Sequence, residues 1–149
     1  MRTGVFVGTF DPFTIGHANI VERALPLFDR LVIGVVADNV HKPSMSPAEE
    51  RVAVIRQVYR DEPRVSVEVF GGLAMDFAKE VGAKFFVKGV RSVSDFEYEQ
   101  AQAEFNRRLG GIETVLLYSE PQLANVSSTA VRELAHFGVD VSQFLPKIK

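Results

Sequence analysis

Short runs of apolar, β-branched and aromatic residues alternate along the chain with longer segments in which apolar residues recur at helical spacing. The short runs cover residues 3–7, 31–37, 65–70, 84–87 and 114–118. Runs of this length and composition are typical of strands that are buried on both faces. The helical segments cover residues 16–25, 47–59, 73–81, 95–109 and 129–137. Five strand–helix alternations predict an α/β fold, with one domain spanning residues 1–149 and a five-stranded, parallel, doubly wound sheet.

The helical segments begin in two different ways. Residues 46–49 (SPAE) and 94–97 (SDFE) each read as a capping box, whose glutamate places negative charge at the helix start. The first and last helices open at residues 14–17 (TIGH) and 127–130 (SSTA), with no acid in the first turn. Such starts leave N–H groups and a positive dipole end available to an external anion, although many helices simply lack a capping box. Three glycines follow helical segments where a left-handed cap is expected: Gly82, Gly110 and Gly138.

Composition and charge narrow the class of protein. Nineteen acidic residues against seventeen basic ones give a net charge of −2, the wrong sign for a general nucleic-acid binder. The chain has no cysteine, which excludes disulfides, thiolate zinc sites and cysteine nucleophiles. No apolar run approaches the ~20 residues of a membrane-spanning helix, and the N-terminus does not read as a signal peptide. We therefore expect a cytoplasmic protein with neither nucleic acid nor membrane as a partner.

Several common catalytic and binding templates are missing from the sequence. There is no G-x-G-x-x-G dinucleotide fingerprint and no G-x-x-x-x-G-K-[ST] phosphate loop. There is no G-x-S-x-G nucleophile elbow, and the three histidines do not have the spacing of metal ligands. Covalent and zinc-based catalysis therefore have no support in the sequence.

Candidate chemistry gathers after the first and fourth strands. Residues 8–17 (GTFDPFTIGH) follow the first strand, and residues 88–92 (KGVRS) follow the fourth. In a doubly wound sheet, ligands bind beyond the carboxyl ends of the strands, where the strand order reverses. In the order 3-2-1-4-5 the first and fourth strands are neighbours at that point, so both loops are expected to line one crevice. A glycine in each loop is expected to let the backbone approach a ligand closely.

These two loops and two later segments carry a family resemblance. The GTFDPFTIGH run resembles the first signature of the HxGH-type nucleotidyltransferases, and its T-x-G-H form is that of the branch whose acceptor is 4′-phosphopantetheine. Residues 88–99 (KGVRSVSDFEYE) resemble the R-G-[LI]-R-x-x-x-D-F-E-Y-E segment of this branch. Residues 106–109 (NRRL) and 126–133 (VSSTAVRE) are similar to its last two blocks, and the tail at 140–146 also fits. The resemblance covers essentially the whole chain and implies a Rossmann-like nucleotidyltransferase fold.

The resemblance implies an enzyme that joins ATP and 4′-phosphopantetheine to give dephospho-coenzyme A and pyrophosphate. It also implies Mg²⁺ as cofactor and a homohexamer. The attacking group is then a phosphate, whose second pKa of ~6 leaves it ionised at neutral pH. No general base is needed, and catalysis comes from in-line positioning and from donors and cations around the α-phosphate.

Roles for individual residues follow from the same resemblance. His17, in the first helical turn, would donate a hydrogen bond to the ATP phosphates, and a helix N-terminus favours its neutral form. Lys42 and Arg91 would be the catalytic cations. The implied ATP-binding residues are Thr9, Phe10, His17, Gly89, Val90, Arg91, Glu99, Leu123, Ala124, Asn125, Val126, Ser127, Ser128 and Thr129. The implied acceptor-binding residues are Thr9, Lys42, Ala74, Lys88 and Asn106.

The residues themselves leave a second interpretation open. His17 could be a partly buried structural histidine, and Lys88 and Arg91 could be solvated surface charges. Glu99 and Asn106 are seven residues apart, which places them on one helix face, where they could form an exposed polar stripe. The motifs single out no ligand for Mg²⁺.

The chain departs from the family pattern at two places. Lys88 stands where the family usually has arginine, so the charge is kept but the bidentate fork is lost. Residues 40–43 (VHKP) stand where the family usually has a pair of lysines before proline. Lys42 is the better match to the catalytic lysine, and His41 occupies the alternative register.

Two other functions compete with this interpretation. One is a nucleotidyltransferase with another acceptor, such as nicotinate mononucleotide or glycerol 3-phosphate. The block at 95–99 together with Asn106 favours the pantetheine branch. The other is a nucleotide sensor or a receiver-like module without catalysis. A receiver needs clustered acids at the strand ends, whereas Asp11 is the only acid in the two crevice loops.

Overall fold

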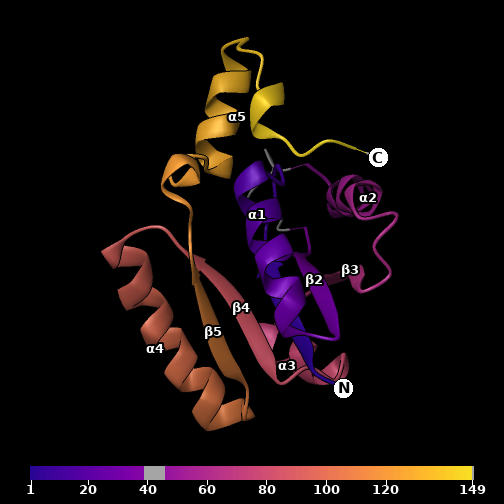
Figure 1. Cartoon of the computed structure of the whole chain (residues 1–149), viewed down its shortest axis with the longest axis vertical. Coiled ribbons are helices and arrows are strands. Elements are labelled where there is room, and N and C mark those ends of the chain that lie inside the picture. The colour runs from indigo at the N-terminus through magenta and orange to yellow at the C-terminus, as the bar shows by residue number, and fades with distance from the viewer. Residues whose placement is uncertain (39–45, 149) are drawn as a thin grey trace.

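The computed structural model describes residues 1–38 and 46–148. Its five parallel strands form one sheet (Figure 1). The strands are β1 (Thr3–Gly8), β2 (Arg30–Val36), β3 (Val65–Phe70), β4 (Phe85–Val90) and β5 (Glu113–Tyr118). They lie in the order β3-β2-β1-β4-β5, which confirms the predicted α/β class and strand order.

Five α-helices alternate with the strands, and each predicted helix is present to within two residues at either end. They are α1 (Ile15–Ala24), α2 (Ala48–Val58), α3 (Ala74–Glu80), α4 (Val93–Gly110) and α5 (Ser128–His136). Short 3₁₀ turns cover Leu25–Leu27, Pro121–Leu123 and Ser142–Phe144. In Figure 1, α1 crosses in front of the sheet, α4 runs along the edge formed by β5, and α5 stands beyond the carboxyl ends of the strands.

The sheet is covered on both faces because successive strand residues point to opposite sides. Phe6, Leu31 and Ile33 pack with residues of α1 and α2 in one apolar cluster. Val5 and Val32 pack with residues of α3 in a second cluster on the other face. Helix α4 contacts β4, β5 and α3, yet none of its residues is buried within the chain.

The two predicted capping boxes do not form as expected. Helix α2 begins after Pro47, which has no capping side chain, and the Ala48 N–H donates instead to the Asp38 carboxylate from outside the helix at 2.6 Å. Helix α4 begins two residues earlier than predicted, and the hydroxyl that caps it belongs to Ser92, which accepts the Asp95 N–H at 3.2 Å. Both predictions were wrong because the predicted caps, Ser46 and Ser94, are not the groups that accept N–H bonds at the two helix starts. Asp38 accepts at α2 and Ser92 accepts at α4.

Two of the three predicted glycine caps are confirmed. Gly82 and Gly138 have positive φ angles of 74° and 81°, the left-handed conformation that favours glycine. Gly110 is still helical, and the left-handed cap of α4 is the next residue, Gly111, with φ 66°. A Cβ atom on Gly110 would lie 2.4 Å from the Met75 sulfur, so the flexible Met75 side chain fills the space that this glycine leaves between α3 and α4.

Strands β1 and β4 run side by side for only part of their length. They are in register at two residue pairs, Gly4–Phe85 and Val5–Phe86, whereas each of the other neighbouring strand pairs shares six. Beyond these pairs, the carboxyl-terminal halves of β1 and β4 are not paired with each other. This separation opens the sheet at the point where the strand order reverses.

Candidate functional site

A cavity of about 420 Å³ lies where β1 and β4 separate, a size typical of small-molecule sites. It confirms the prediction that residues following the first and fourth strands line one crevice. Many of the predicted site residues line it, namely Phe10, His17, Lys88, Gly89, Arg91, Glu99, Leu123, Val126, Ser127, Ser128 and Thr129. Residues 126–129 enter from the start of α5, so segments far apart in sequence meet at the cavity.

Other predicted residues are not part of the cavity lining. They are Thr9, Ala74, Val90, Asn106, Ala124 and Asn125. Thr9 falls between two lining residues, and Ala74 begins α3, which packs against the distant half of α4. Lys42 and the alternative His41 lie outside the described residues, so their predicted role stays a prediction.

The cavity also contains residues that the sequence analysis did not select: Phe6, Val7, Gly8, Gly16, Ile20, Asp95, Tyr98 and Ser119. Ser119 follows directly after β5, so the rule that ligands bind beyond strand ends could have found it. Asp95 and Tyr98 belong to the DFEYE block and lie four residues and one residue before Glu99, which the sequence analysis had selected.

His17 is fixed by the start of its own helix. The backbone N–H of Thr14 donates to His17 Nδ1 at 2.9 Å, and the Thr14 hydroxyl accepts the His17 N–H at 3.4 Å. This is a capping box in which histidine occupies the position usually held by glutamate or glutamine. Because Nδ1 accepts a hydrogen bond, the ring proton sits on Nε2 in the neutral form. Nε2–H is then the donor that remains for a ligand in the cavity.

Three phenyl rings enclose the His17 imidazole. Phe10 meets it edge-on with ring centroids 5.0 Å apart, Phe13 stacks on it at 5.4 Å, and Phe6 lies at 6.3 Å. Burial among these rings, together with the smaller effect of the positive charge of Arg91, lowers the pKa of His17 from 6.5 to about 4. His17 is therefore a neutral hydrogen-bond donor at physiological pH, as the sequence analysis predicted from the helix N-terminus.

The loop that connects β1 to α1 is held in an unusual backbone conformation. Phe10 has φ 53°, the left-handed region that is rare for a residue other than glycine. Its ring lies over Gly8, where a Cβ atom would come within 2.9 Å of the ring carbons. Similarly, a Cβ on Gly89 would approach Ile20 to 3.1 Å. These two glycines make room for neighbouring side chains, and both also line the cavity, so their expected role in letting the backbone approach a ligand stays a prediction.

The wall opposite His17 carries two cations, and one of them, Lys88, is not in the loop where the sequence analysis placed it. Lys88 lies inside β4 rather than in the loop after it, since the strand continues to Val90 in register with β5. Its Nζ lies 3.5 Å from Glu99 Oε2, with the two side chains 24% and 13% exposed. Glu99 Oε2 is buried and has no hydrogen-bond partner among the described residues. Lysine and glutamate therefore form a half-buried ion pair that faces the cavity.

Arg91 follows β4 and is held by the start of α4. Its backbone N–H donates to Asp95 Oδ2 at 3.1 Å, and its Nε lies 3.7 Å from the same oxygen. The Arg91 side chain remains 43% exposed, so the guanidinium can still bind another anion. Arg91 and Lys88 thus place two positive charges on the wall opposite His17.

The start of α5 is attached to the β1–α1 loop. Ser128 Oγ donates to the Pro12 carbonyl at 2.7 Å. Arg132 donates to the Asp11 carbonyl and, at 3.3 Å, to the Thr129 hydroxyl. The Ser127 hydroxyl caps α5 by accepting the Ala130 N–H, and the first turn contains no acid. The starts of α1 and α5 therefore reach the same cavity with hydroxyl caps and without negative charge, which favours an anionic ligand.

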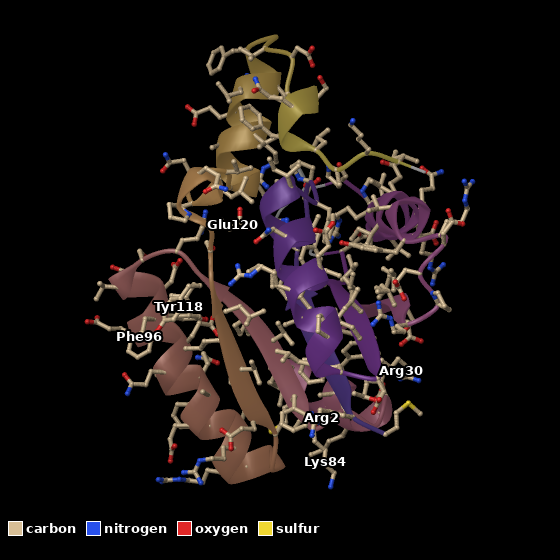
Figure 2. The ribbon with its side chains drawn as sticks, viewed as in Figure 1. Arg2, Arg30, Lys84, Phe96, Tyr118 and Glu120 are labelled. Atoms are coloured by element: carbon tan, nitrogen blue, oxygen red, sulfur yellow. The ribbon has the colours of Figure 1, made fainter. Side chains whose placement is uncertain are left out.

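The turn after β5 is tied to α1 from the other side. Asn19 Nδ2 donates to Glu120 at 3.1 Å, and Arg23 donates to the Tyr118 carbonyl at 2.6 Å. Figure 2 shows Tyr118 and Glu120 near the carboxyl end of the sheet, whereas Arg2, Arg30 and Lys84 lie at the opposite end. These contacts hold Ser119 and the following turn at the mouth of the cavity.

The carboxylates of the cavity fit a cation that arrives with a phosphate ligand. Among residues 1–38 and 46–148, no group of three or more His, Cys, Asp or Glu side chains could hold a metal ion. Asp95 and Glu99 line the cavity, and each lies beside a cation. Mg²⁺ is commonly held by one or two carboxylates together with substrate phosphates, and this donor set suits that arrangement. As a separate point, none of the helices within the described residues combines the length and the hydropathy of a membrane-spanning segment.

Comparisons with solved structures agree on the fold. A bifunctional NMN adenylyltransferase/ADP ribose pyrophosphatase from Francisella tularensis superposes with a TM-score of 0.74 at 17% identity. The match covers 98% of this chain and 45% of that one, so the chain spans just under half of that bifunctional protein. A lipopolysaccharide core biosynthesis protein from Thermoplasma volcanium superposes with a TM-score of 0.58 at 20% identity, over 80% of this chain and 97% of that chain.

Sequence comparisons identify the family. The model of the cytidylyltransferase-like family matches residues 5–134. A phosphopantetheine adenylyltransferase from Bacteroides fragilis is 52% identical over 99% of this chain and 97% of its own length. One of the same name from Phocaeicola vulgatus is 51% identical with the same coverage. The strand order, the cavity at the point where it reverses and these full-length matches agree: the chain belongs to the cytidylyltransferase-like family and, within it, to the phosphopantetheine adenylyltransferases.

Proposed function

We propose that this chain transfers the adenylyl group of ATP to 4′-phosphopantetheine, with dephospho-coenzyme A and pyrophosphate as products. One observation carries the proposal furthest. A neutral imidazole donor, two cations and two helix starts without acids converge on one cavity at the β1–β4 opening. Such an array stabilises phosphate charge and requires no nucleophile on the protein.

The reaction balances without a protein base. An oxygen of the acceptor phosphate, whose second pKa is ~6, is already ionised and attacks the α-phosphorus of ATP. The bond between the α-phosphorus and the oxygen that bridges to the β-phosphate breaks, and pyrophosphate leaves with the electron pair. The task left to the protein is to hold the two substrates in line and to stabilise charge on the α-phosphate.

The wall formed by β1 and α1, together with the start of α5, holds the ATP phosphates in this proposal. His17 Nε2–H donates to a phosphate oxygen, and Arg91 faces it from the other wall. Backbone N–H groups and hydroxyls at 127–129 add donors at the start of α5. Phe10, Gly89, Val90, Glu99 and the turn at 123–126 complete the nucleotide site, with that turn over the adenine.

The acceptor lies toward the other end of the cavity. Lys88 binds its phosphate, Thr9 lies between the two substrates, and Ala74 and Asn106 contact the pantetheine arm. Lys42 is assigned as the catalytic lysine from the motif alone, with His41 as the alternative register. These assignments rest on the motif match of the sequence and on the position of Lys88 within the cavity lining.

Mg²⁺ enters this proposal with ATP. The ion supplies positive charge that offsets the charge of the triphosphate. Asp95 or Glu99 would be the carboxylate that holds it from the protein side, in keeping with the preference of Mg²⁺ for oxygen ligands. Because both carboxylates lie beside cations, the protein itself contributes little net negative charge to the cavity.

We also infer a homohexamer that works in the cytoplasm, where ATP is available. Helix α4 buries none of its residues within one chain and exposes several large apolar side chains: Val93, Phe96, Tyr98, Phe105 and Leu109. Single chains rarely expose a helix of this kind unless another surface covers it. Light scattering tests the assembly: a mass six times that of the chain supports the hexamer, and a monomer contradicts it.

An acceptor comparison tests the activity directly. The purified protein is incubated with ATP, Mg²⁺ and one acceptor at a time: 4′-phosphopantetheine, nicotinate mononucleotide or glycerol 3-phosphate. We expect pyrophosphate and dephospho-coenzyme A with the first acceptor and no comparable pyrophosphate release with the other two. Turnover with another acceptor would contradict the substrate, and nucleotide binding without pyrophosphate release would indicate a sensor.

A further inference from the structure

Arg51 is a buried charge at the edge of the site, and neither the motifs nor the cavity lining includes it. It lies in the first turns of α2, and its side chain is only 2% exposed. Burial of a guanidinium costs several kcal/mol unless its N–H groups are bonded. In this chain they are bonded to a particular set of acceptors.

Three backbone segments converge on the Arg51 guanidinium. Nη1 donates to the carbonyl of Thr9 at 2.8 Å and to the carbonyl of Val36 at 2.9 Å. Nε donates to the Ser46 carbonyl at 2.8 Å, and Nη2 lies 3.2 Å from Asp38 Oδ1. A planar fork can satisfy several acceptors at once in a way that a lysine ammonium cannot. Arg51 therefore joins the ends of β1 and β2 to the segment that leads into α2.

The hydrogen bond from Arg51 to the Thr9 carbonyl is the one that connects Arg51 to the catalytic site. Thr9 immediately precedes Phe10, whose left-handed backbone is a conformation that a non-glycine residue adopts only at a cost of about 1 kcal/mol or more. The Phe10 ring in turn contacts the His17 imidazole edge-on at 5.0 Å. The Thr9 carbonyl belongs to the peptide group that joins Thr9 to Phe10. A hydrogen bond that fixes this carbonyl therefore restrains the Phe10 backbone and the position of its ring, and through that ring the His17 imidazole.

We propose that Arg51 is a positioning residue for adenylyl transfer, which holds the Thr9–Phe10 turn in the conformation that presents His17 and Thr9 to the substrates. The inference rests on the proposed function for its effect on turnover. Its effect on the His17 environment does not depend on that function. Arg51 touches no substrate in this account and acts through the loop.

The test compares Arg51→Lys and Arg51→Met with Arg56→Met. Arg56 lies on the same helix and donates twice to one backbone carbonyl, that of Val67, at 3.2 and 2.7 Å. Val67 belongs to β3 and lies outside the cavity lining. Arg56→Met therefore removes a comparable arginine–carbonyl contact without touching the β1–α1 loop.

At a temperature where circular dichroism shows every variant folded, we expect Arg51→Lys to lower kcat by about tenfold to a hundredfold, because small misplacements of catalytic groups have effects of that size. Arg51→Met should lower it more, so that the lysine partly rescues the methionine variant. Arg56→Met should keep wild-type kcat. Wild-type kcat in folded Arg51→Lys, or an equal loss in Arg56→Met, would overturn the proposal.

A nuclear magnetic resonance experiment on ¹⁵N-labelled His17 separates this inference from the proposed function. In Arg51→Lys, we expect the ring nitrogen resonances to move and the pKa of His17 to rise toward its ordinary value, as the phenyl enclosure loosens. Arg56→Met should leave both unchanged. If no acceptor releases pyrophosphate with the wild-type protein, the function fails while this readout still decides the role of Arg51. An unchanged His17 signal in Arg51→Lys would contradict that role.

Should both Arg51 variants fail to fold, Asp38→Asn provides the same test at lower risk. The Asp38 side chain is 66% exposed, and the substitution weakens one of the contacts of Arg51 without removing the arginine. We expect a smaller fall in kcat and a smaller shift of the His17 resonances in the same directions. Wild-type values for both measurements would overturn the proposal.

Discussion

The two walls of the cavity are built in opposite ways. On the β1–α1 wall, Phe10, Phe13 and Thr14 are buried, and each hydrogen bond that orients His17 comes from the backbone or side chain of the same helix start. On the β4–α4 wall, Lys88 and Arg91 are partly exposed, and α4 buries none of its residues. One wall is enclosed and preorganised, and the other carries charge on accessible side chains.

This difference separates two tasks of the enzyme. A donor that must meet charge only in the transition state gains most from a fixed, desolvated position, because no reorganisation is then needed during the reaction. A cation that binds a substrate phosphate gains affinity in the ground state and tolerates some freedom. We therefore expect changes at His17 on the β1–α1 wall to act mainly on kcat, and changes at Lys88 on the β4–α4 wall to act mainly on KM.

The largest effect is expected for His17→Ala, which should lower kcat by ~10²–10⁴ with a smaller change in the KM for ATP. The alanine also removes the acceptor for the Thr14 N–H, so it costs stability as well as chemistry. His17→Gln is the matched variant, since glutamine at this helix position can accept that N–H in an ordinary capping box.

Steady-state kinetics and thermal unfolding of both His17 variants separate the catalytic role of this residue from its role as a helix cap. We expect glutamine to restore much of the stability and at most part of kcat. An alanine variant with most of its kcat would remove His17 from the mechanism. Full recovery of kcat by glutamine in step with stability would reduce His17 to a helix cap.

The enclosure of His17 also predicts a loss of stability in acid. The pKa of His17 is lowered from 6.5 to about 4 in the folded chain, so between these values the unfolded chain binds a proton that the folded chain does not. The free energy of unfolding therefore falls as the pH drops below 6.5, and the fall ends near pH 4 at about 3 kcal/mol. Urea titrations at pH 7 and pH 4 should show a larger loss for the wild type than for His17→Gln. Equal losses would mean that His17 is not desolvated.

On the other wall, Lys88→Ala should raise the KM for 4′-phosphopantetheine about ten- to a hundredfold, with far less effect on the KM for ATP. A charge-assisted contact of roughly 1.5–3 kcal/mol accounts for this range. Lys88→Arg should keep substantial activity because both cations bind the same anion. Both constants are measured at saturating co-substrate. Equal changes in the two, or none in either, would make Lys88 an ordinary surface charge and would break the distinction between the walls.

The smallest effect is expected for an ion pair that lies on neither wall. Arg64 contacts Glu62 at 2.8 and 3.1 Å, a shorter distance than that between Lys88 and Glu99. Exposed pairs of this kind contribute little to stability whatever their geometry. Arg64→Gln should leave kcat, both KM values and the thermal midpoint close to those of the wild type. A marked loss of activity would show that position in the cavity is not what gives Lys88 its role.

Sequence patterns predicted the strands and helices well, because the burial of each element determines the spacing of its apolar residues. A parallel sheet covered on both faces leaves short apolar runs such as residues 65–70, whose predicted and observed limits agree. The position of Lys88 was harder, because a lysine followed by glycine suggests a loop. In the structure the ladder with β5 extends through both residues, since the side chain of Lys88 reaches the cavity and Gly89 faces Ile20.

The supports of the site could not be predicted from local sequence. Arg51 sits in an ordinary helical stretch (EERVAVIRQV), where arginine is expected on the surface. Arg51 is buried because the backbone segments at Thr9, Val36 and Ser46 come together around its side chain. A local sequence pattern cannot predict contacts between segments that are distant in sequence. The same holds for Arg132, which joins α5 to the Asp11 carbonyl. His17 was found through its motif, but its tautomer and its phenyl enclosure emerged only from the fold.

The state of the His17 ring is the most direct test of this account. Protein labelled with ¹⁵N in histidine is titrated while the ring nitrogen resonances are followed, with His17→Gln used to assign the signal. We expect a neutral ring with its proton on Nε2 throughout the physiological range, and a pKa of about 4. A pKa near the ordinary value of 6.5, or a proton on Nδ1, would contradict the claim that the β1–α1 wall presents a fixed, neutral donor to the phosphates.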